Sequence, residues 1–353
     1  MKCAVLLSGG VDSSVALRLL KNQGTYDLTA FYLKIWLEDE LAHMGECPWE
    51  ADLIEARAVC EDAGVPLEIV SLQREYWERV VSHTLAELRA GRTPSPDILC
   101  NERVKFGAFL ERIGSEFDKV ASGHYARTVE EDGLTWLLRA KDPVKDQTYF
   151  LSHLSQEQMR RVVFPIGHLT KPEVRATAAA MALPNRARPD SQGICFLGKI
   201  PYNEFVRFHL GEKKGSIVEQ KTGRILGPHK GTWFHTIGQR KGLGLSGGPW
   251  FVSGKDLERN LIFVVHTSEA DEVAGREFLI SGLNWIAGAP SGQGLSVKIR
   301  HGEKRVPAVA ESVAEGCLRI AMAEPDRGIA PGQYAVLYEG ERCLGGGIIT
   351  QAL

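Results

Sequence analysis

The 353-residue sequence lacks several features that would place it in a class at once. It has no Gly-x-x-x-x-Gly-Lys-Ser/Thr motif, which excludes a Walker A phosphate loop. It has no apolar run long enough to cross a membrane, and because an apolar run follows directly after Lys2, we expect no signal or transit peptide. Its net charge of −2 gives by itself no sign of a nucleic-acid partner. These absences leave a globular chain of two or three domains.

The cysteines exclude two further classes of protein. There are seven, an odd number, and no Cys-x-x-Cys pair occurs, which argues against a secreted disulfide framework and against a zinc ribbon. A reducing compartment, the cytoplasm, fits better, and a working cysteine pair would then be catalytic. Cys47 receives no assignment. We expect four of the others in the core: Cys3, Cys60, Cys317 and Cys343.

Charge is distributed unevenly along the chain. Residues 199–244 hold nine Lys or Arg against three Glu, a net charge of +6, which leaves −8 for the rest. Aromatic side chains and cations occur together within residues 233–245, a pattern suited to RNA contacts. A second basic cluster surrounds a turn at residues 298–305. The alternative for both segments is a solvated positive surface or a charged hairpin tip.

The start of the chain has the pattern of an anion site. Residues 4–7 form a short apolar run typical of a buried parallel strand, and apolar residues repeat at helical spacing from Val11 onward. Residues 8–14 between them read SGGVDSS. Glycine lets a phosphate approach the backbone, and the first N–H groups of a helix carry the positive end of its dipole. We therefore expect a phosphate loop in which Asp12 holds Mg²⁺; the alternative is an ordinary turn with Asp12 or Ser13 as the helix cap.

Three domains are expected. Residues 1–198 alternate strands and helices, which predicts an α/β fold with a Rossmann-like parallel sheet. Residues 199–272 form a glycine-rich, basic central domain. Short strands separated by turns follow from residue 261 onward and suggest a small closed β-barrel, which we assign to residues 273–353. In the first domain we expect strands at 28–35, 67–72 and 119–123, a hairpin at 128–139, and helices at 51–63, 76–90, 102–113 and 171–183.

Two cysteines lie in polar loops rather than in apolar segments. Cys100 ends a loop with two prolines, which we expect to be stiff and extended, and a helix is expected from Glu102. Cys100 would then lie at a helix N-terminus, where the dipole favours the thiolate, with Asp97 nearby as a general acid or base. Cys195 follows a glycine-containing turn, so the two thiols could meet across the ligand crevice. The alternative for either is a buried, inert thiol.

Taken together, the motifs resemble one family. SGGVDSS, GRTPSPDILCN, GHYAR, KDQTYFL, GICF, HTIGQRKGLG and LGGGII occur in the order seen in the tRNA-specific 2-thiouridylases. These belong to the N-type ATP pyrophosphatases (PP-loop enzymes). The resemblance implies an ATP-dependent enzyme that adenylates the C2 oxygen of a wobble uridine. A cysteine persulfide then delivers sulfur, which gives 2-thiouridine, AMP and pyrophosphate.

The resemblance also implies roles for individual residues. Cys195 would carry the persulfide, Cys100 would be the second, nucleophilic thiol, and Asp97 would assist proton transfer. Two positions depart from the family pattern, because Ser95 replaces an asparagine and His301 a tyrosine. ATP would be bound by Ser8, Gly9, Gly10, Val11, Asp12, Ser13, Leu33 and Gly123. The tRNA would be contacted by Ser95, Pro96, Lys145, Asp146, Gln147, Arg300 and His301.

Several alternatives stay open at this point. Asp97, Cys100 and Cys195 could instead ligate an iron–sulfur cluster that delivers sulfide. The sulfur donor is a relay protein or a cysteine desulfurase, the tRNAs are of the Glu, Gln and Lys type, and a monomer is expected. Rival functions are another PP-loop enzyme, such as an amidating synthetase or a different tRNA thiolase, and an RNA-binding protein with an inactive nucleotide site.

Overall fold

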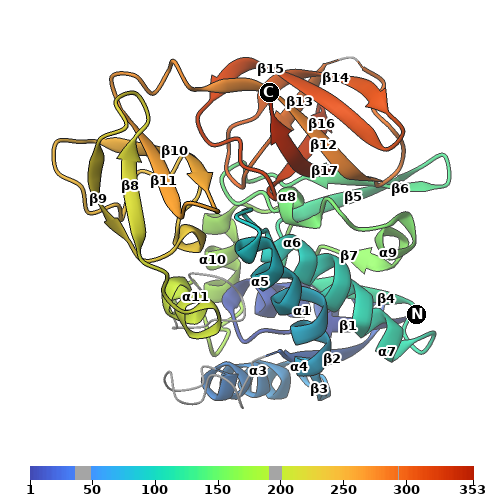
Figure 1. Ribbon diagram of the computed structural model, residues 1–353. Coiled ribbons are helices and arrows are strands. Elements are labelled where there is room, and N and C mark those ends of the chain that lie inside the picture. The colour runs from blue at the N-terminus through green and yellow to red at the C-terminus, as the bar shows by residue number, and fades with distance from the viewer. Residues whose placement is uncertain (36–48, 191–200, 293) are drawn as a thin grey trace.

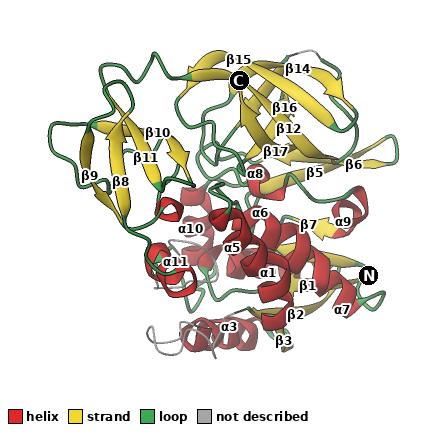
Figure 2. Cartoon of the chain, viewed as in Figure 1, coloured by secondary structure: helices red, strands yellow, loops and turns green. Residues whose placement is uncertain are grey.

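The computed structural model describes residues 1–35, 49–190, 201–292 and 294–353. Helices gather around one sheet in the first half of the chain, whereas the second half forms two groups of strands (Figures 1 and 2). Both groups of strands lie at the same end of the helical part, side by side. Cys47 and Cys195 fall outside the described residues.

The first half is built on a parallel sheet, as expected. Its strand order is β3-β2-β1-β4-β7, and every neighbouring pair is parallel. Residues of β1 alternate between two cores, with Ala4 and Leu6 on one face and Cys3 and Val5 on the other. This alternation explains why the strand is apolar throughout. The strands are β1 Lys2–Leu6, β2 Asp27–Lys34, β3 Leu67–Ser71, β4 Lys119–Ser122 and β7 Val162–Val163.

Helices cover both faces of this sheet. Side chains from α1 and α3 join the core that contains Cys3, and those from the helices between residues 73 and 113 join the other core. Two stretches adopt the wider π-helical turn, η2 Trp77–Val81 and η3 Asn101–Ala108. The α-helices are α1 Val11–Gln23, α3 Trp49–Ala63, α4 Gln73–Tyr76, α5 Ser82–Arg89, α6 Pro96–Cys100, α7 Phe109–Ile113, α8 Thr148–Leu151, α9 Gln156–Arg161 and α10 Lys171–Ala180.

A four-stranded sheet follows the first half of the chain. Its order is β10-β11-β8-β9. The strand expected at residues 261–266, which we grouped with the barrel strands, belongs here instead, because it pairs with β8 and β10. The elements are α11 Tyr202–Leu210, β8 Gly215–Glu219, β9 Ile225–His229, η4 Thr232–Phe234, β10 Trp250–Asp256 and β11 Leu261–His266.

The last part of the chain is the expected closed barrel. Among the described residues six strands form the ring, in the order β12-β15-β14-β13-β16-β17, and pairing of β12 with β17 closes it. These strands are β12 Gly275–Trp285, β13 Leu295–Lys298, β14 Val306–Ala314, β15 Cys317–Asp326, β16 Tyr334–Glu339 and β17 Arg342–Ala352.

The hairpin predicted at residues 128–139 in the first half of the chain pairs with a strand of the barrel. It consists of β5 Ala126–Glu131 and β6 Leu134–Arg139. β6 pairs with β17, with Leu138 opposite Arg342 and Leu137 opposite Cys343, so that the hairpin extends the barrel sheet. The hairpin was predicted from the sequence, but its place in the barrel sheet was not.

The expected core cysteines are largely buried. Cys3, Cys60 and Cys343 are buried, whereas Cys317 is partly exposed at the start of β15.

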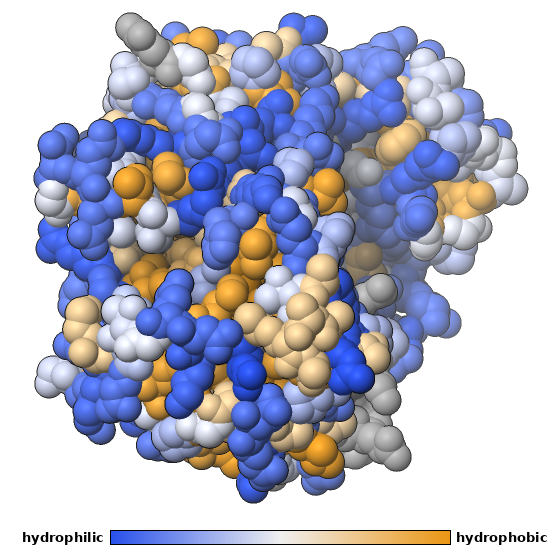
Figure 3. All heavy atoms as spheres, turned by 180° about the vertical axis from the view of Figure 1, so that it is seen from behind, coloured by the Kyte–Doolittle hydropathy of each residue, from blue (hydrophilic) through white to orange (hydrophobic). Residues whose placement is uncertain are grey.

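Seen from behind, the surface is mostly hydrophilic, with hydrophobic residues concentrated over the centre of that face (Figure 3). Within the ranges that the structure describes, every helix is too short or too polar to span a membrane.

Candidate functional site

The loop between β1 and α1 has the geometry of a phosphate cradle. Gly9 has φ +74°, and a Cβ at this residue would lie 2.3 Å from the carbonyl oxygen of Asp52, so both conformation and space require glycine. Gly10, not Asp12 or Ser13, is the N-cap of α1, and no side chain caps this end of the helix. The first N–H groups of α1 therefore receive no side-chain cap, and they lie at the carboxyl edge of the sheet, where the start of a helix can bind an anion.

Serine hydroxyls hold this loop in shape. The Ser13 hydroxyl donates to the Gly10 carbonyl at 2.9 Å and accepts from the Ser8 N–H at 3.2 Å. The Ser14 hydroxyl also donates to the Gly10 carbonyl, at 3.0 Å. Val11 is buried in a hydrophobic core cluster, and its packing there holds the start of α1 in place. The loop is thus preorganised by its own side chains.

Asp12 lies at the centre of a charged group that the sequence did not reveal. Lys171, the first residue of α10, donates to both Asp12 oxygens at 2.7 and 2.9 Å, and the Tyr125 hydroxyl donates to one of them at 2.9 Å. Burial, with the neighbouring Asp12 carboxylate, raises the pKa of the Tyr125 hydroxyl. Lys171 also contacts the Asp190 carboxylate at 2.8 Å, so that one ammonium bridges two carboxylates.

The segment before residue 191 closes the loop from one side. The Asn185 amide donates to the Gly9 carbonyl at 2.8 Å and to the Ser14 hydroxyl at 2.9 Å. The Arg188 guanidinium donates to the same carbonyl at 3.0 Å and pairs with Asp52 of α3. These contacts hold the segment that contains Asn185 and Arg188 against the loop.

Gly123 and Leu33, the two expected neighbours of adenosine, occupy different surroundings. Leu33 is half-buried near the carboxyl end of β2, at the same edge as the loop, and packs against the core. Gly123 follows β4 and lies against the first turn of α1, because a Cβ there would meet the Ser13 nitrogen at 2.7 Å. Gly123 therefore has a packing role that brings β4 and the helix start together.

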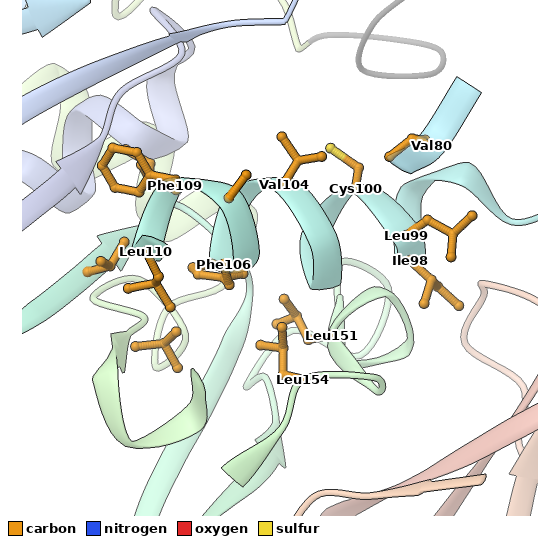
Figure 4. Packing of buried hydrophobic residues seen from close by; sticks show 14 of the residues in the cluster. Val80, Ile98, Leu99, Cys100, Val104, Phe106, Phe109, Leu110, Leu151 and Leu154 are labelled. Atoms are coloured by element: carbon orange, nitrogen blue, oxygen red, sulfur yellow. The ribbon is translucent and has the colours of Figure 1, made fainter. Parts of the chain in front are cut away.

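The expectation for Cys100 was wrong in two respects. The helix begins at Pro96, not at Glu102, because Pro96 takes the first helical position, where its missing N–H costs nothing. Cys100 is consequently in the second turn and is only 1% exposed, not placed in a polar loop. Figure 4 shows Cys100 on the same helix face as Val104, with Val80 close to its side chain. Asp97, in the first turn, is half-buried.

The candidate tRNA-contacting residues divide into exposed and buried ones. Lys145 is partly exposed and contacts Asp190 at 3.3 Å. Gln147 accepts from the Tyr125 N–H at 2.9 Å. Arg300 is exposed and pairs with Asp326. Exposed His301 stacks on Phe150, with ring centroids 4.5 Å apart and planes at 28°. Ser95 precedes the helix as its N-cap residue, and Pro96 is buried.

Asp146 differs from its neighbours because it is completely buried. Its carboxylate contacts the Lys298 ammonium at 3.1 Å and Arg139 at 3.5 Å, and the side chains of both Asp146 and Lys298 are 0% exposed. It also accepts from the Thr148 hydroxyl and the Ala140 N–H. Lys298 was expected at an exposed charged turn, so its burial corrects that expectation. The pair joins the KDQ segment to strand β13 of the barrel.

Models of known families match all three parts of the chain. The tRNA methyl transferase HUP domain matches residues 1–199, the tRNA methyl transferase PRC-barrel domain residues 203–266, and the Aminomethyltransferase beta-barrel domain residues 275–349. A protein of Parabacteroides distasonis named tRNA-specific 2-thiouridylase MnmA is 49% identical over 99% of both chains. Relatives of that name from Bacteroides thetaiotaomicron and Porphyromonas gingivalis are 48% and 46% identical, over 99% of this chain and 100% and 99% of theirs.

The chain belongs to the tRNA-specific 2-thiouridylase family. The resemblance drawn from the motifs is therefore confirmed, together with the Rossmann-like sheet and the barrel. Membership in this PP-loop family implies the use of ATP, and the loop of residues 8–14 is the place where the geometry fits it.

The donor set around the loop fits a magnesium ion. The Asp12 carboxylate lies within contact distance of the Lys171 ammonium, so a divalent cation could take the place of that ammonium beside Asp12. Mg²⁺ is commonly held by one or two carboxylates together with phosphate oxygens. Over the described parts of the chain, no three His, Cys, Asp or Glu side chains gather into a metal cluster. Of the possible iron–sulfur ligands, Asp97 and Cys100 lie on one helix, and Cys195 is outside the described residues.

Four polar residues around the phosphate loop were missed by sequence reasoning: Lys171, Asn185, Arg188 and Asp190. The sequence offered one signal, since Arg186, Arg188 and Asp190 crowd the segment directly before the second cysteine motif. Lys171 gave none beyond its place at a helix start, because its two carboxylate partners are distant in sequence.

Proposed function

We propose that this protein is a tRNA 2-thiouridylase that converts a wobble uridine into 2-thiouridine with ATP as the activating substrate. What carries the proposal is the similarity over 99% of the chain to proteins named tRNA-specific 2-thiouridylase, in a chain that keeps the phosphate loop intact. We include tRNAs of the Glu, Gln and Lys type as substrates, a relay protein or cysteine desulfurase as sulfur donor, a monomer, and the cytoplasm as location.

The proposed chemistry has two stages. Uridine C2 carries a poor leaving oxygen, so ATP first adenylates that oxygen and pyrophosphate leaves. The loop amides would offset the phosphate charge, and Mg²⁺ held by Asp12 would neutralise further charge. The terminal sulfur of a persulfide on Cys195 then attacks C2 and AMP departs. Leu33 and Gly123 stay proposals as adenosine neighbours.

Cys100 completes the cycle in this proposal. Its thiolate attacks the Cys195 sulfur, which leaves the transferred sulfur on C2 and forms a Cys100–Cys195 disulfide for a reductant to cleave. Asp97 would accept the thiol proton. Because Cys100 is 1% exposed, this step requires a rearrangement of the α6–η3 helix, and the π-helical turn that follows Cys100 supplies a place for it.

The test is single-turnover thiolation. Unmodified tRNA-Glu transcript, Mg-ATP and a cysteine desulfurase with cysteine as the persulfide source are mixed with the protein, and the digested RNA is searched by mass for 2-thiouridine. Cys100→Ser and Cys195→Ser should both be inactive. Cys60→Ser, a buried cysteine of α3 that has no part in the proposed chemistry, serves as the matched control and should remain active. Thiolation by both serine variants would refute the cysteine chemistry, and absence of 2-thiouridine with wild type would refute the substrate.

Iron dependence separates the persulfide route, which we propose, from the iron–sulfur alternative. Anaerobically purified protein would be assayed before and after chelation, with its iron content and visible spectrum recorded. Unchanged thiolation after chelation supports the persulfide. Loss of activity together with a cluster absorption band, both restored by reconstitution, would establish the cluster instead.

A further inference from the structure

Asp190 is surrounded by three cationic side chains from different parts of the sequence. Its carboxylate contacts Lys171 at 2.8 Å, Lys145 at 3.3 Å and Arg175. Partial burial alone would raise the pKa of this carboxyl, but hydrogen bonds from Lys171, Arg175 and Lys145 hold it at about 2. Asp190 therefore carries a negative charge at every physiological pH, and the three cations share this one carboxylate.

Two of these cations face two different substrates of the proposed reaction. Lys171 has its second contact with Asp12 of the phosphate loop, at 2.7 Å, and its side chain is only 14% exposed. Lys145 belongs to the KDQ segment, and its side chain is 43% exposed. Asp190 thus lies between an ammonium in the nucleotide site and an ammonium available to an RNA phosphate.

The charges predict how this group responds to a magnesium nucleotide. A divalent cation on Asp12 repels the Lys171 ammonium that now occupies both Asp12 oxygens. Lys171 keeps Asp190 as its remaining carboxylate, and Arg175 stays on the same group. With its charge met by two cations, Asp190 holds the third, Lys145, less strongly.

We propose that Asp190 couples the two substrate sites, so that loading of the magnesium nucleotide at Asp12 releases Lys145 for a phosphate of the tRNA. The inference rests on the proposed function. Linkage requires the reverse effect of equal size, since tRNA that draws Lys145 away leaves Asp190 to Lys171 and frees Asp12 for the metal ion. Asp190 is a positioning residue in this scheme and touches neither substrate.

A simpler reading is that Asp190 only anchors its own segment. The structure separates the two readings, because Asn185 and Arg188 tie the same segment to the Gly9 carbonyl without using Asp190. Asp190→Asn keeps the side-chain volume and leaves those ties in place. The variant should therefore fold and keep the loop while it loses the shared charge.

The experiment measures coupling by binding alone. The dissociation constant of fluorescently labelled tRNA-Glu transcript is measured by anisotropy with and without the α,β-methylene analogue of ATP, in Mg²⁺ and in EDTA. Reciprocally, the affinity for the analogue is measured with and without tRNA. Glu277→Gln, in the barrel pair with Arg319, removes the same charge elsewhere and is the matched control.

For wild type and Glu277→Gln we expect the magnesium analogue to tighten tRNA binding about 5-fold or more, the lower range of known couplings. In EDTA the analogue should have no such effect. Asp190→Asn should bind tRNA without nucleotide at least as tightly as loaded wild type, with the effect of the analogue below about 2-fold. Lys145→Ala should bind tRNA weakly and show no coupling.

Three results would overturn the inference. Coupling in Asp190→Asn equal to that of wild type would show that the charge at Asp190 is not involved. Absence of coupling in wild type that still binds tRNA would refute the relay and leave the proposed function intact. If wild type binds no tRNA under any condition, the proposed function and the inference both fail.

Discussion

The buried pair of Asp146 and Lys298 offers the most direct test of how the first half of the chain is joined to the barrel. We predict that Asp146→Asn destabilises the protein strongly, although the substitution keeps the volume of the side chain. The Lys298 ammonium, 3.1 Å from the carboxylate and with 0% of its side chain exposed, would lose its counter-ion. Burial already lowers the pKa of Lys298, and the charge of Asp146 opposes that shift.

The size of the effect follows from the geometry. Two unit charges 3.1 Å apart attract each other by about 5 kcal/mol at an effective dielectric constant of about 20. Removing one partner of a buried pair costs about 3–5 kcal/mol in measured cases. Lys298→Met should cost less, because Asp146 keeps Arg139, the Thr148 hydroxyl and the Ala140 N–H. The double variant leaves no unpaired charge and should recover at least half of the loss.

Thermal unfolding of the four proteins gives the ranking. At about 2 °C per kcal/mol, the lower figure for domains of 150–250 residues, Asp146→Asn should lower the midpoint by at least about 6 °C. The double variant should lie between Asp146→Asn and wild type, so that the coupling energy of the cycle is large. A loss below about 1 kcal/mol for Asp146→Asn, or a double variant that simply adds the two single losses, would refute the reasoning.

Three further predictions concern other parts of the molecule. Gly123→Ala should weaken binding of an ATP analogue about 10-fold by calorimetry, because the new methyl group would lie 2.7 Å from the Ser13 nitrogen and displace the start of α1; unchanged affinity would show that the loop tolerates the shift. Burial lowers the pKa of Lys255 from 10.5 to about 8, so the folded state disfavours its charge and wild-type stability should rise between pH 8 and 10.5, where the unfolded chain holds the extra proton. Lys255→Met should lack that rise and be more stable at pH 7 by up to about 3 kcal/mol in denaturant titrations; parallel pH profiles for the two proteins would contradict this. Phe150→Ala should weaken tRNA binding about 2- to 10-fold, because His301 loses the ring on which it stacks; equal affinity would remove this stack from the RNA surface.

The parallel sheet could be predicted because its information is local. Strands such as β1 and β2 contain apolar runs, and glycines such as Gly24 end the neighbouring helices. The phosphate loop could be predicted for the same reason, since strand, glycines and helix follow one another directly. In the second half of the chain, the alternation of apolar and polar residues predicted where the strands lie but not which strands pair. For this reason residues 261–266 were grouped with the barrel, although they pair with β8.

What could not be predicted depends on contacts between distant positions. Pro96 fits both an extended loop and the first turn of a helix, and only packing against residues such as Val80 and Leu151 favours the helix that buries Cys100. Lys298 looks like a surface cation until Asp146, 152 positions away, provides its counter-ion. The bridge from Asp12 through Lys171 to Asp190 joins three segments that have no common motif.

The pairing of β6 with β17 has a consequence for how the protein is made. Arg139 at the end of β6 contacts Glu341 beside β17 across 202 positions of the chain. At about 5–20 residues per second, a ribosome needs roughly 10–40 s to add the later partner after the earlier one. Throughout this interval the hairpin β5–β6 presents an unpaired strand edge, which neighbouring nascent chains could capture. Synthesis therefore leaves the first-made half of the molecule unfinished until the last barrel strand emerges, and a chaperone that shields this edge would raise the yield of native protein.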